Sequence, residues 1–483
     1  MVNLELTQLK IDKALENFKK AEYQETIHIL ENLEDKNSNF LICWYLGHAY
    51  FRIYDYSSAT ENIKQSIKLK GPDELNQSFL GEILLESNQY SDAIELFKNV
   101  LKINEKNINA LFNLGKISFQ QGNFKISEGY YNKIIQNEPN NFKALYELIK
   151  IDKKYLSPDK IEIVKNHKDQ NNLNNVYASF ILAENDKDSK NFSSEIDNLL
   201  KGHKDYLKTK EIAAAQEFNY FINLLPKFTQ KVRKVEFDSS SDYEPIFVMG
   251  LPRSGTTMIE NLITSNDSKI SRGDETGVMG KVFFSKRIII NYNAKNLNTN
   301  FNFDKNDFEK LKDSILKQYN QIGIDISKGS FTDKSLENFL YIDVLNKIFP
   351  KAKFIYCKRN YVANLLGIIK VFLPNMLWCH SLENIVKFIE LYQNKLNEIL
   401  TDKNIKIKVI NLEDFSNDPL NNSKDLFKFL GMKWSKDVLN SNSYNKSIIK
   451  TVSNVQVRNK ILKHDLSYLE NYVSILEKYG IKN

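Results

Sequence analysis

The sequence predicts a multidomain protein in which an all-α repeat array precedes an α/β domain built on a parallel sheet. Glycines recur at a fixed spacing in the first third of the chain. In the second half, apolar runs at residues 246–249, 354–357 and 405–412 alternate with helical patterns. Strands that alternate with helices favour a parallel sheet covered by helices. The 483 residues are enough for two or more such cores.

The repeat array is indicated by three glycines, Gly47, Gly81 and Gly115, which lie 34 residues apart. A small residue follows each of them after twelve positions, and an apolar or aromatic residue follows four positions later: Ala59 and Ile63, Ala93 and Phe97, Ser127 and Tyr131. A period of 34 residues is that of the tetratricopeptide repeat, with two helices per unit. Small residues let neighbouring helices approach, and large ones fill the groove between them. We therefore predict a tetratricopeptide solenoid over residues 1–156.

The rest of the chain divides by composition. Residues 157–238 are polar and rich in Lys and Asn, with helical stretches such as 211–225, and we expect an irregular helical linker there. The run Ser239-Ser240-Ser241-Asp242 marks a boundary, so the α/β domain is expected to span residues 239–483.

Bulk properties restrict the function classes. The net charge of +7 is spread along the chain without a dense basic run, which fits an anionic ligand but does not favour nucleic acid. The three cysteines lie far apart, so we expect neither disulfides nor a cysteine zinc site. The N-terminus lacks a signal-peptide pattern, and no apolar stretch approaches the ~20 residues of a membrane span. We expect a cytoplasmic protein without a membrane span.

The segment 245–257, Pro-Ile-Phe-Val-Met-Gly-Leu-Pro-Arg-Ser-Gly-Thr-Thr, is the most informative part of the sequence. It predicts a strand, a short loop and the start of a helix, an arrangement that aims backbone N–H groups at an anion. Gly250 and Gly255 have the spacing of a P-loop, but Thr256 stands where a nucleoside triphosphatase has lysine. Arg253 is the cation of this loop. The loop is therefore P-loop-like and suits a phosphate group, but not ordinary triphosphate hydrolysis.

Four further polar blocks follow this loop. They are Gly273-Asp274-Glu275-Thr276, Thr332-Asp333-Lys334-Ser335, Cys357-Lys358-Arg359-Asn360 and the segment 451–458, which contains Ser453 and Arg458. Taken singly, Glu275 fits a solvated loop acid, Lys334 a surface lysine and Arg359 an ion-pair partner. Asp333 also fits a helix N-cap.

In this order the loop and the four blocks resemble the sulfotransferase family. The likeness is to tetratricopeptide-repeat sulfotransferases, with a catalytic half similar to tyrosylprotein sulfotransferases. It implies 3′-phosphoadenosine 5′-phosphosulfate (PAPS) as donor and a hydroxyl acceptor, with no metal. It also implies roles for matching residues: the 5′-phosphosulfate would be held by Arg253, Ser254, Gly255, Thr256 and Thr257, the 3′-phosphate by Arg359, and the nucleotide would be covered by Ser453 and Arg458.

The same resemblance implies the catalytic group. Glu275 would take the proton of the acceptor hydroxyl, and Lys334 with Arg253 would stabilise the charge of the leaving phosphate. The acceptor is left open between a protein tyrosine and a hydroxyl of a glycan or small molecule. The repeats would bind a peptide or protein, and homo-oligomerisation is left open. The apolar segment 372–381 fits either an acceptor pocket or plain packing, and His380 within it fits a gate or packing residue.

The sequence departs from the family pattern after Arg359. Tyr361 replaces the usual proline, Gly367 replaces a serine that binds the 3′-phosphate, and Leu469 stands at the position of a tryptophan. One lost hydrogen bond to a charged group costs ~1.5–3 kcal/mol. These departures leave an alternative, a protein-binding scaffold whose nucleotide-binding domain is weakened. A small-molecule kinase is disfavoured by the missing lysine of the loop.

Overall fold

The structure is a computed structural model, and it describes residues 2–167, 172–237, 239, 241–265, 270–286, 288, 304–439, 448–451, 454–458 and 463–481. The chain forms two compact units. Unit 1 contains Met1–Ile117, Val278–Asn300 and Glu309–Asp325, and unit 2 contains Ser118–Gly277, Phe301–Phe308 and Ile326–Asn483. The division falls inside helix α7 (Ile108–Gln120). Our boundaries at 156 and 238, which follow composition, stay a prediction.

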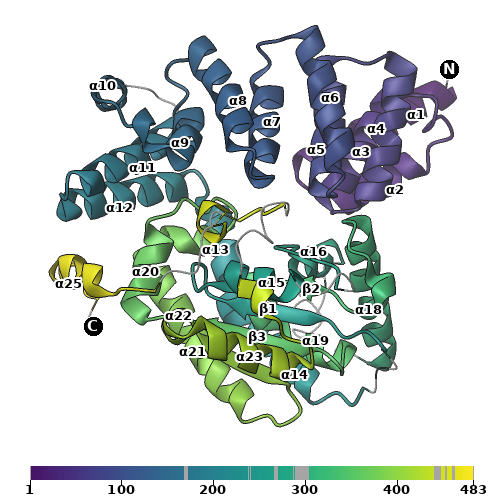
Figure 1. Cartoon of the computed structure of the whole chain (residues 1–483). Helices are drawn as coiled ribbons and strands as arrows, with labels where there is room; N and C mark the ends of the chain where they lie inside the picture. Colours follow the sequence, from purple (N-terminus) through teal and green to yellow (C-terminus); the bar gives the residue numbers. More distant parts are fainter. Residues whose placement is uncertain are drawn as a thin grey trace. The chain divides into compact units, whose positions relative to one another are not determined.

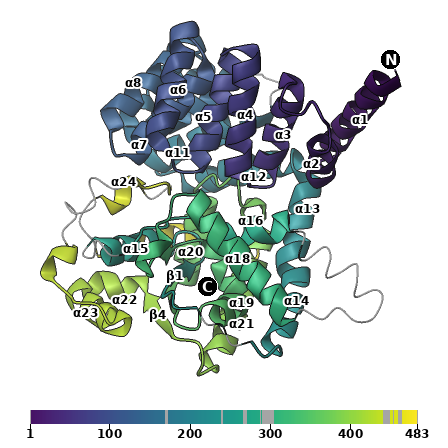
Figure 2. The ribbon, with the colours of Figure 1, turned by 90° about the vertical axis from the view of Figure 1, so that its right-hand side faces the viewer.

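Unit 1 is built from antiparallel helix pairs. Its first six helices are α1 (Val2–Lys19), α2 (Tyr23–Glu31), α3 (Phe40–Arg52), α4 (Tyr56–Lys70), α5 (Glu74–Glu86) and α6 (Tyr90–Ile103), and α3 to α6 stack side by side in Figure 2. Ala59, Ala93, Ile63 and Phe97 are fully buried, as the repeat pattern predicts. A Cβ on Gly47 would lie 2.5 Å from Cδ1 of Ile63, so this glycine is what lets α3 and α4 approach. The helices α16 (Val278–Ser285) and most of α18 (Lys305–Gln321) also belong to unit 1.

Unit 2 begins with further helices. They are α8 (Phe124–Asn137), α9 (Phe142–Ile151), η1 (Lys153–Tyr155), α10 (Pro158–Asn166), α11 (Asn172–Asp188), α12 (Phe192–Lys208), α13 (Glu211–Asn219), the π-turn η2 (Tyr220–Leu224) and α14 (Leu225–Arg233). The segment 157–238, where we expected an irregular helical linker, is helical over most of its length and includes the π-turn η2. Helices α11 and α12 pack against each other through buried residues that include Val176, Phe180 and Leu199.

A parallel sheet of four strands forms the centre of unit 2, in the order β2-β1-β3-β4. The predicted strands are confirmed as β1 (Ile246–Gly250), β3 (Lys353–Lys358) and β4 (Ile407–Asn411). The edge strand β2 (Thr332–Asp333) has two residues and was not predicted as a strand. Every residue of β1 is buried, as expected for a central parallel strand.

Helices cover both faces of this sheet (Figure 1). On one face α15 (Thr256–Thr264), α22 (Leu412–Asn417) and α23 (Pro419–Leu430) enclose a core with Val248 and Ile355. On the other face, Tyr356 contacts an aromatic ring of η4 (Leu336–Tyr341). Phe247 contacts an aromatic ring in the turn after α19 (Ile342–Ile348).

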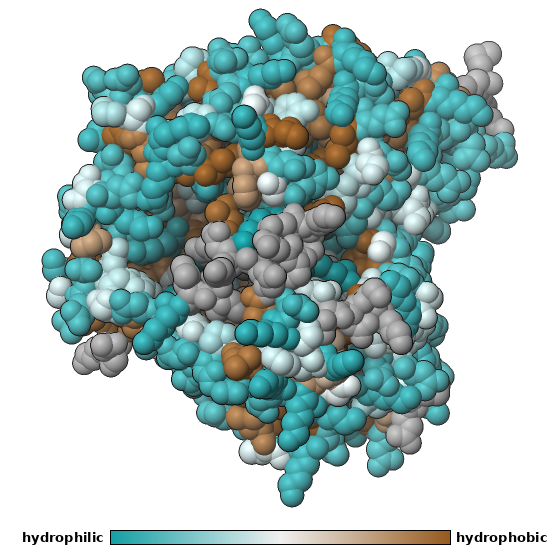
Figure 3. Space-filling view, viewed as in Figure 1, coloured by the Kyte–Doolittle hydropathy of each residue, from teal (hydrophilic) through white to brown (hydrophobic). Residues whose placement is uncertain are grey.

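The remaining elements are η3 (Ile326–Lys328), α20 (Tyr361–Ile369), η5 (Leu377–His380), α21 (Leu382–Leu400), η6 (Lys436–Leu439), α24 (Asn454–Val457), η8 (Ser467–Leu469) and α25 (Glu470–Glu477). The face drawn in Figure 3 is mostly hydrophilic, with hydrophobic residues in small patches. Within the part of the chain that the structure describes, no helix has the length and hydropathy to span a membrane.

Candidate active site

The loop between β1 and α15 depends on two glycines. Gly250 and Gly255 have φ values of 151° and 91°, in the region that favours glycine. A Cβ on Gly250 would lie 2.5 Å from the carbonyl oxygen of Cys357, and one on Gly255 would lie 2.7 Å from Cδ1 of Leu412. The loop therefore passes close to both β3 and the segment after β4. It ends at Thr256, where the N-terminus of the nine-residue helix α15 opens.

Two arginines lie side by side at this loop. Nη1 of Arg359, at the end of β3, donates to the carbonyl oxygen of Arg253 over 3.0 Å. Burial and the neighbouring Arg359 lower the pKa of Arg253 to about 10. A buried pair of like charges is unfavourable unless an anion or carboxylate compensates it. The carboxylate next to this pair is Glu413, whose Oε1 lies 4.0 Å from Nε of Arg359.

Gly367 of α20 makes room for this pair. A Cβ at this position would lie 3.1 Å from Cβ of Arg253 and 3.1 Å from Nη1 of Arg359. Contacts this short force one of the neighbours to move. The serine that the family pattern places here would therefore crowd both arginines. A side chain at position 367 would therefore fit only with a small shift of Arg253 or Arg359.

A cavity of about 420 Å³ opens beside the arginine pair, lined by residues that include Ser254, Arg359 and Asn364. The C-terminal segment borders it through Leu466. The hydroxyl of Tyr468 accepts a hydrogen bond of 3.4 Å from Nη2 of Arg359. Among the described residues, Nε of Arg359 is a buried donor without a hydrogen-bond partner. A buried, unused donor beside a polar cavity fits an anionic ligand.

Glu275 and Lys334 meet at the end of strand β2. Oε1 of Glu275 accepts from Nζ of Lys334 over 2.6 Å, and Oδ1 of Asp274 lies 3.3 Å from the same nitrogen. Lys334 is fully buried, while the Glu275 side chain is 37% exposed. Burial alone would lower the pKa of Lys334, but Glu275 and Asp274 raise it above its ordinary value. The site thus holds a charged lysine next to an accessible carboxylate.

Asp333 has a structural role. It accepts from the backbone N and the hydroxyl of Ser335, over 2.8 and 2.6 Å, and from Oγ1 of Thr276 over 2.9 Å. These bonds fix the loop of Glu275 beside β2. Gly273 shows how close the two segments are, because a Cβ there would lie 1.9 Å from the carbonyl oxygen of Thr332.

Two charged residues that the sequence reasoning did not single out lie under this loop. Glu260 of α15 is fully buried, and its Oε2 lies 3.2 Å from Nη2 of Arg272. Burial raises the pKa of Glu260, against the opposing effect of Arg272. The sequence offered a weak signal for Arg272, which directly precedes the polar block Gly273-Asp274-Glu275-Thr276.

The predicted residues of the C-terminal segment have separate outcomes. Ser453 lies outside the described residues. The guanidinium of Arg458 donates to Oδ1 of Asn454 over 2.7 Å and to the carbonyl oxygen of Gln120 over 3.0 Å. Thr451, at the start of this segment, lies against the first turn of α15, where its hydroxyl accepts from Oγ1 of Thr257 over 3.3 Å. The segment therefore reaches both the loop helix and the end of α7.

The segment 372–381 is packed inside unit 2. The Trp378 ring stacks on Phe388 at 4.1 Å, and Phe372 contacts Tyr206 of α12. Nδ1 of His380 lies 2.8 Å from Nδ1 of His203, and burial lowers the pKa of His380 to about 4. These contacts support packing for Phe372, Trp378 and His380.

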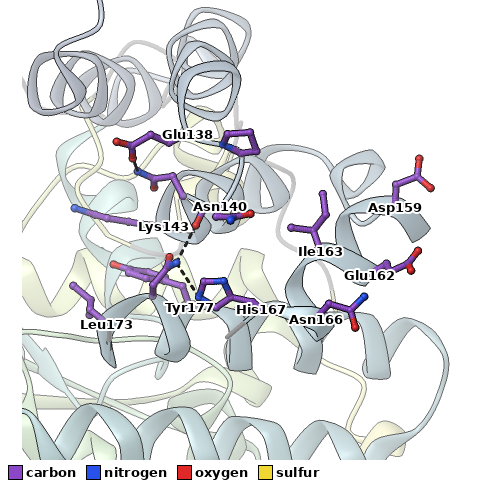
Figure 4. A pocket seen from close by; sticks show the side chains of 13 residues that line it. Glu138, Asn140, Lys143, Asp159, Glu162, Ile163, Asn166, His167, Leu173 and Tyr177 are labelled. Atoms are coloured by element: carbon purple, nitrogen blue, oxygen red, sulfur yellow. Dashed lines mark hydrogen bonds between the residues drawn. The ribbon is translucent and has the colours of Figure 1, made fainter. Parts of the chain in front are cut away.

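A larger cavity of about 1060 Å³ lies among α9, α10 and α11 (Figure 4). Glu138, Lys143 and Glu162 are among its lining residues. Asn174 joins its two sides by donating to the carbonyl oxygen of Asn140 over 2.9 Å. This cavity contains none of the predicted site residues.

Comparison with known families matches two regions of the chain. Residues 245–436 match the sulfotransferase family. Residues 81–122 and 108–141 match the tetratricopeptide repeat. The chain therefore contains a region that matches the sulfotransferase family and, before it, a region that matches the tetratricopeptide repeat. The matched sulfotransferase region contains β1 to β4 and the residues Arg253, Glu275, Lys334 and Arg359.

Individual relatives are distant. An uncharacterized protein of Aquifex aeolicus (strain VF5) is 31% identical over 122 residues, which are 24% of this chain and 15% of that protein. The chain thus spans less than a fifth of the length of this curated relative. The sulfotransferase STF1 from Mycobacterium tuberculosis H37Rv is 11% identical with a TM-score of 0.29, covering 62% of this chain and 98% of that chain. The MamA protein is 19% identical with a TM-score of 0.30, covering 34% of this chain and 93% of that chain.

Proposed function

We propose that this protein moves a sulfuryl group from PAPS to a hydroxyl acceptor, with Glu275 as general base. The observation that carries the proposal is the placement of two charge clusters at one edge of the sheet. Arg253 and Arg359 follow β1 and β3, and Lys334 with its partner Glu275 lies at β2. Carboxyl ends of parallel strands meet at one edge, where α/β proteins bind ligands.

The residues of the loop fit the anionic part of such a donor. Gly250 and Gly255 let the loop pass close to Cys357 and Leu412, and the α15 N-terminus favours negative charge. The paired guanidiniums suit tetrahedral oxyanions, which they bind through several donors at once. We assign Ser254, Thr256 and Thr257 to the 5′ side and Arg359 to the 3′-phosphate. Ser453 and Arg458 stay candidates for the cover of the nucleotide.

The chemistry follows from these charges. In the transfer, the bond between sulfur and the phosphate oxygen breaks while a bond between sulfur and the acceptor oxygen forms, and the acceptor proton passes to Glu275. Lys334 and Arg253 stabilise the charge that develops on the leaving phosphate oxygen. Sulfuryl transfer, like phosphoryl transfer, depends mainly on positioning and electrostatics. A carboxylate base contributes ~10²–10⁴-fold to such a reaction.

The repeats supply a protein-binding capacity, and we propose that they recruit a peptide or protein acceptor. Tetratricopeptide arrays present stacked helices whose concave surface is extended. The acceptor hydroxyl would then belong to a tyrosine side chain or to a glycan. The matches of residues 81–122 and 108–141 to the tetratricopeptide repeat support this proposal.

The test measures transfer of labelled sulfate from PAPS and binding of adenosine 3′,5′-bisphosphate by calorimetry. Glu275→Gln is expected to lower kcat by ~10²–10⁴-fold without loss of bisphosphate affinity. Arg359→Ala is expected to weaken bisphosphate binding by ~1.5–3 kcal/mol. The matched control is Glu383→Gln, because this glutamate is 74% exposed and lies at the start of α21. Full activity of Glu275→Gln with every acceptor, or tighter binding of ATP with Mg²⁺ than of the bisphosphate, would contradict the proposal.

A further inference from the structure

The loop of Glu275, strand β2 and the helix of the anion loop are joined by one buried carboxylate. Oε1 of Glu260 accepts from the backbone N of Asp274 over 2.9 Å and from Oγ1 of Thr332 over 2.7 Å. Asp274 directly precedes Glu275 in the chain, and Thr332 stands two residues before Lys334. Glu260 itself lies one turn after the start of α15 at Thr256. A single side chain thus contacts all three segments.

Arg272, which precedes the loop of Glu275, also binds Glu260. We call the contacts of Glu260 with Asp274, Thr332 and Arg272 the clamp. Nη2 of Arg272 lies 3.2 Å from Oε2 of Glu260, and its Nη1 donates to Oδ1 of Asn261 and to Oγ1 of Thr264, the latter over 3.4 Å. The Glu260 side chain is fully buried, and that of Arg272 is 18% exposed. A buried ion pair with further hydrogen bonds has one favourable geometry, which makes it suitable for fixing two segments in register.

We infer that Glu260 is a positioning residue that holds Glu275 and Lys334 in register with the anion loop. The inference rests on the proposed function. Glu260 positions Glu275 and Lys334 indirectly, through its hydrogen bonds with Asp274 and Thr332.

The backbone between these residues explains why such a clamp is needed. Asp274 has φ of 61°, a left-handed conformation that is uncommon outside glycine, although Asp adopts it more readily than most residues. Its carbonyl oxygen accepts from the backbone N of Lys334 over 2.9 Å, so a shift of Asp274 moves the lysine and the base together. A displacement of ~1 Å at reacting groups costs ~10²-fold in rate. The hydrogen bond from Asp274 N to Glu260 holds this left-handed turn in place.

The experiment compares the full chain with Glu260→Ala and Glu260→Gln. The amide of Gln keeps an oxygen that can accept both hydrogen bonds, whereas Ala removes it. The first measurement is hydrogen exchange at the backbone amide of Asp274, and the second is kcat and KM for PAPS in sulfuryl transfer. We expect Glu260→Ala to exchange faster at Asp274 and to lose ~10²-fold in kcat with little change in KM. Glu260→Gln keeps the oxygen that accepts both hydrogen bonds but loses the ion pair with Arg272, so its exchange rate and kcat are expected to lie between those of the unchanged protein and those of Glu260→Ala.

Asp343→Asn is the matched control, because it also removes a buried charge from unit 2. Asp343 of α19 is 2% exposed and pairs with Arg233 over 2.6 Å and with Lys395 over 2.5 Å. This variant is expected to lower stability while Asp274 exchange and the kcat-to-KM pattern stay as in the unchanged protein. The inference is overturned if Glu260→Ala exchanges at Asp274 at the original rate. It is also overturned if Glu260→Gln or Asp343→Asn loses as much kcat as Glu260→Ala.

The two measurements separate this inference from the proposed function. If the unchanged protein transfers no sulfate, the proposed function fails, and the clamp then stands or falls on the exchange rate at Asp274. If the unchanged protein is active and Glu260→Ala matches it in kcat, the function stands and the positioning role is wrong.

Discussion

At the scale of single residues, Gly367 stands where the family pattern has a serine that binds the 3′-phosphate. Its absent side chain leaves space that Arg253 and Arg359 occupy, at 3.1 Å from where a Cβ would be. We therefore expect Gly367→Ala and Gly367→Ser to weaken bisphosphate binding, because overpacking costs about 1–3 kcal/mol. Calorimetry with adenosine 3′,5′-bisphosphate measures the effect directly.

The control for this substitution is Gly129→Ala. Gly129 also lies inside a helix, α8, but an added Cβ would meet nothing within 4 Å. Alanine there is expected to stabilise the protein by ~1 kcal/mol through helix propensity alone and to leave bisphosphate affinity unchanged. Tighter binding by Gly367→Ser would show that a hydroxyl at this position outweighs the crowding and would refute the steric explanation.

Asp274 gives a pH-dependent prediction at the same scale. Burial would raise the pKa of its carboxyl, but Lys334 and Arg272 lower it to about 2, below the ordinary value of 3.8. A carboxyl with a depressed pKa stabilises the fold above its unfolded pKa, and this contribution is lost as pH falls through the folded value. Breaking the pair with Asp274→Asn is expected to cost ~3 kcal/mol near neutral pH.

The measurement is the free energy of unfolding of both proteins between pH 2 and 7. The difference between them should be constant above about pH 5 and should shrink from about pH 4 down to pH 2. Asparagine tolerates a positive φ, so the backbone at this position is not an additional cause of the loss. A difference that stays constant down to pH 2 would mean that the ion pair with Lys334 does not stabilise the fold.

At the scale of elements, the strength of the sequence pattern decided what could be predicted. The apolar run 246–249 is long enough to predict a buried strand, and β1 confirms it. Strand β2 has two residues, too few for any periodicity, and was missed. The segment 157–238 is rich in Lys and Asn, so we expected only an irregular helical linker, although apolar residues such as Phe180 and Leu199 are buried along α11 and α12.

The residues of the candidate site also differ in how well the sequence predicts them. Arg253, Glu275, Lys334 and Arg359 stand in compact polar blocks at strand ends, and the fold brings them to one sheet edge. Glu260 is a single acid within a helical segment, a pattern typical of solvated helix faces. Its burial depends on Arg272 and Thr332, which come from other segments. Pairwise burial of this kind has no signature in a single sequence.

The short helix η4 carries a further pH-dependent element. Burial raises the pKa of Glu337 to about 8, and the nearby Glu217 and Glu275 add to the effect. A raised carboxyl pKa means that the folded state binds the proton more tightly than the unfolded chain does. Stability is therefore lost as pH rises from about 4.5, the unfolded value, to about 8. We expect Glu337→Gln to be more stable than the unchanged protein at pH 9, with the advantage vanishing near pH 4.

Denaturant unfolding at pH 4, 7 and 9 tests this expectation. Glu383→Gln serves as the control, because Glu383 is exposed and its pKa is lowered by a hydrogen bond from Lys387. Its difference from the unchanged protein should not vary between pH 7 and 9. An equal, pH-independent effect of Glu337→Gln would contradict the raised pKa.

At the scale of the molecule, the helices before the sheet belong to the same compact unit as the sheet. Helix α12 makes several contacts with the chain after residue 245. Glu195 pairs with Lys370 over 2.9 Å and accepts from the hydroxyl of Tyr472 over 2.7 Å, and the hydroxyl of Tyr206 donates to the carbonyl oxygen of Pro374 over 3.0 Å. His203, on the same helix, meets His380. A family match that begins at residue 245 leaves these contacts out.

This organisation predicts the behaviour of fragments. A fragment of residues 239–483 would expose the apolar surface that α11 to α14 cover and would leave Glu195 partners such as Lys370 unpaired. Each large apolar side chain that becomes exposed loses ~1.5–3 kcal/mol of stabilisation. The loss from a few such side chains exceeds the free energy of unfolding of a typical domain. A fragment of residues 104–483 keeps these helices, although α16 and most of α18 lose their partners in unit 1, and it should show a cooperative transition that 239–483 lacks. Scanning calorimetry of both fragments decides the matter: a cooperative transition of 239–483 at the same Tm as 104–483 would mean that the boundary at 238 separates an independent domain.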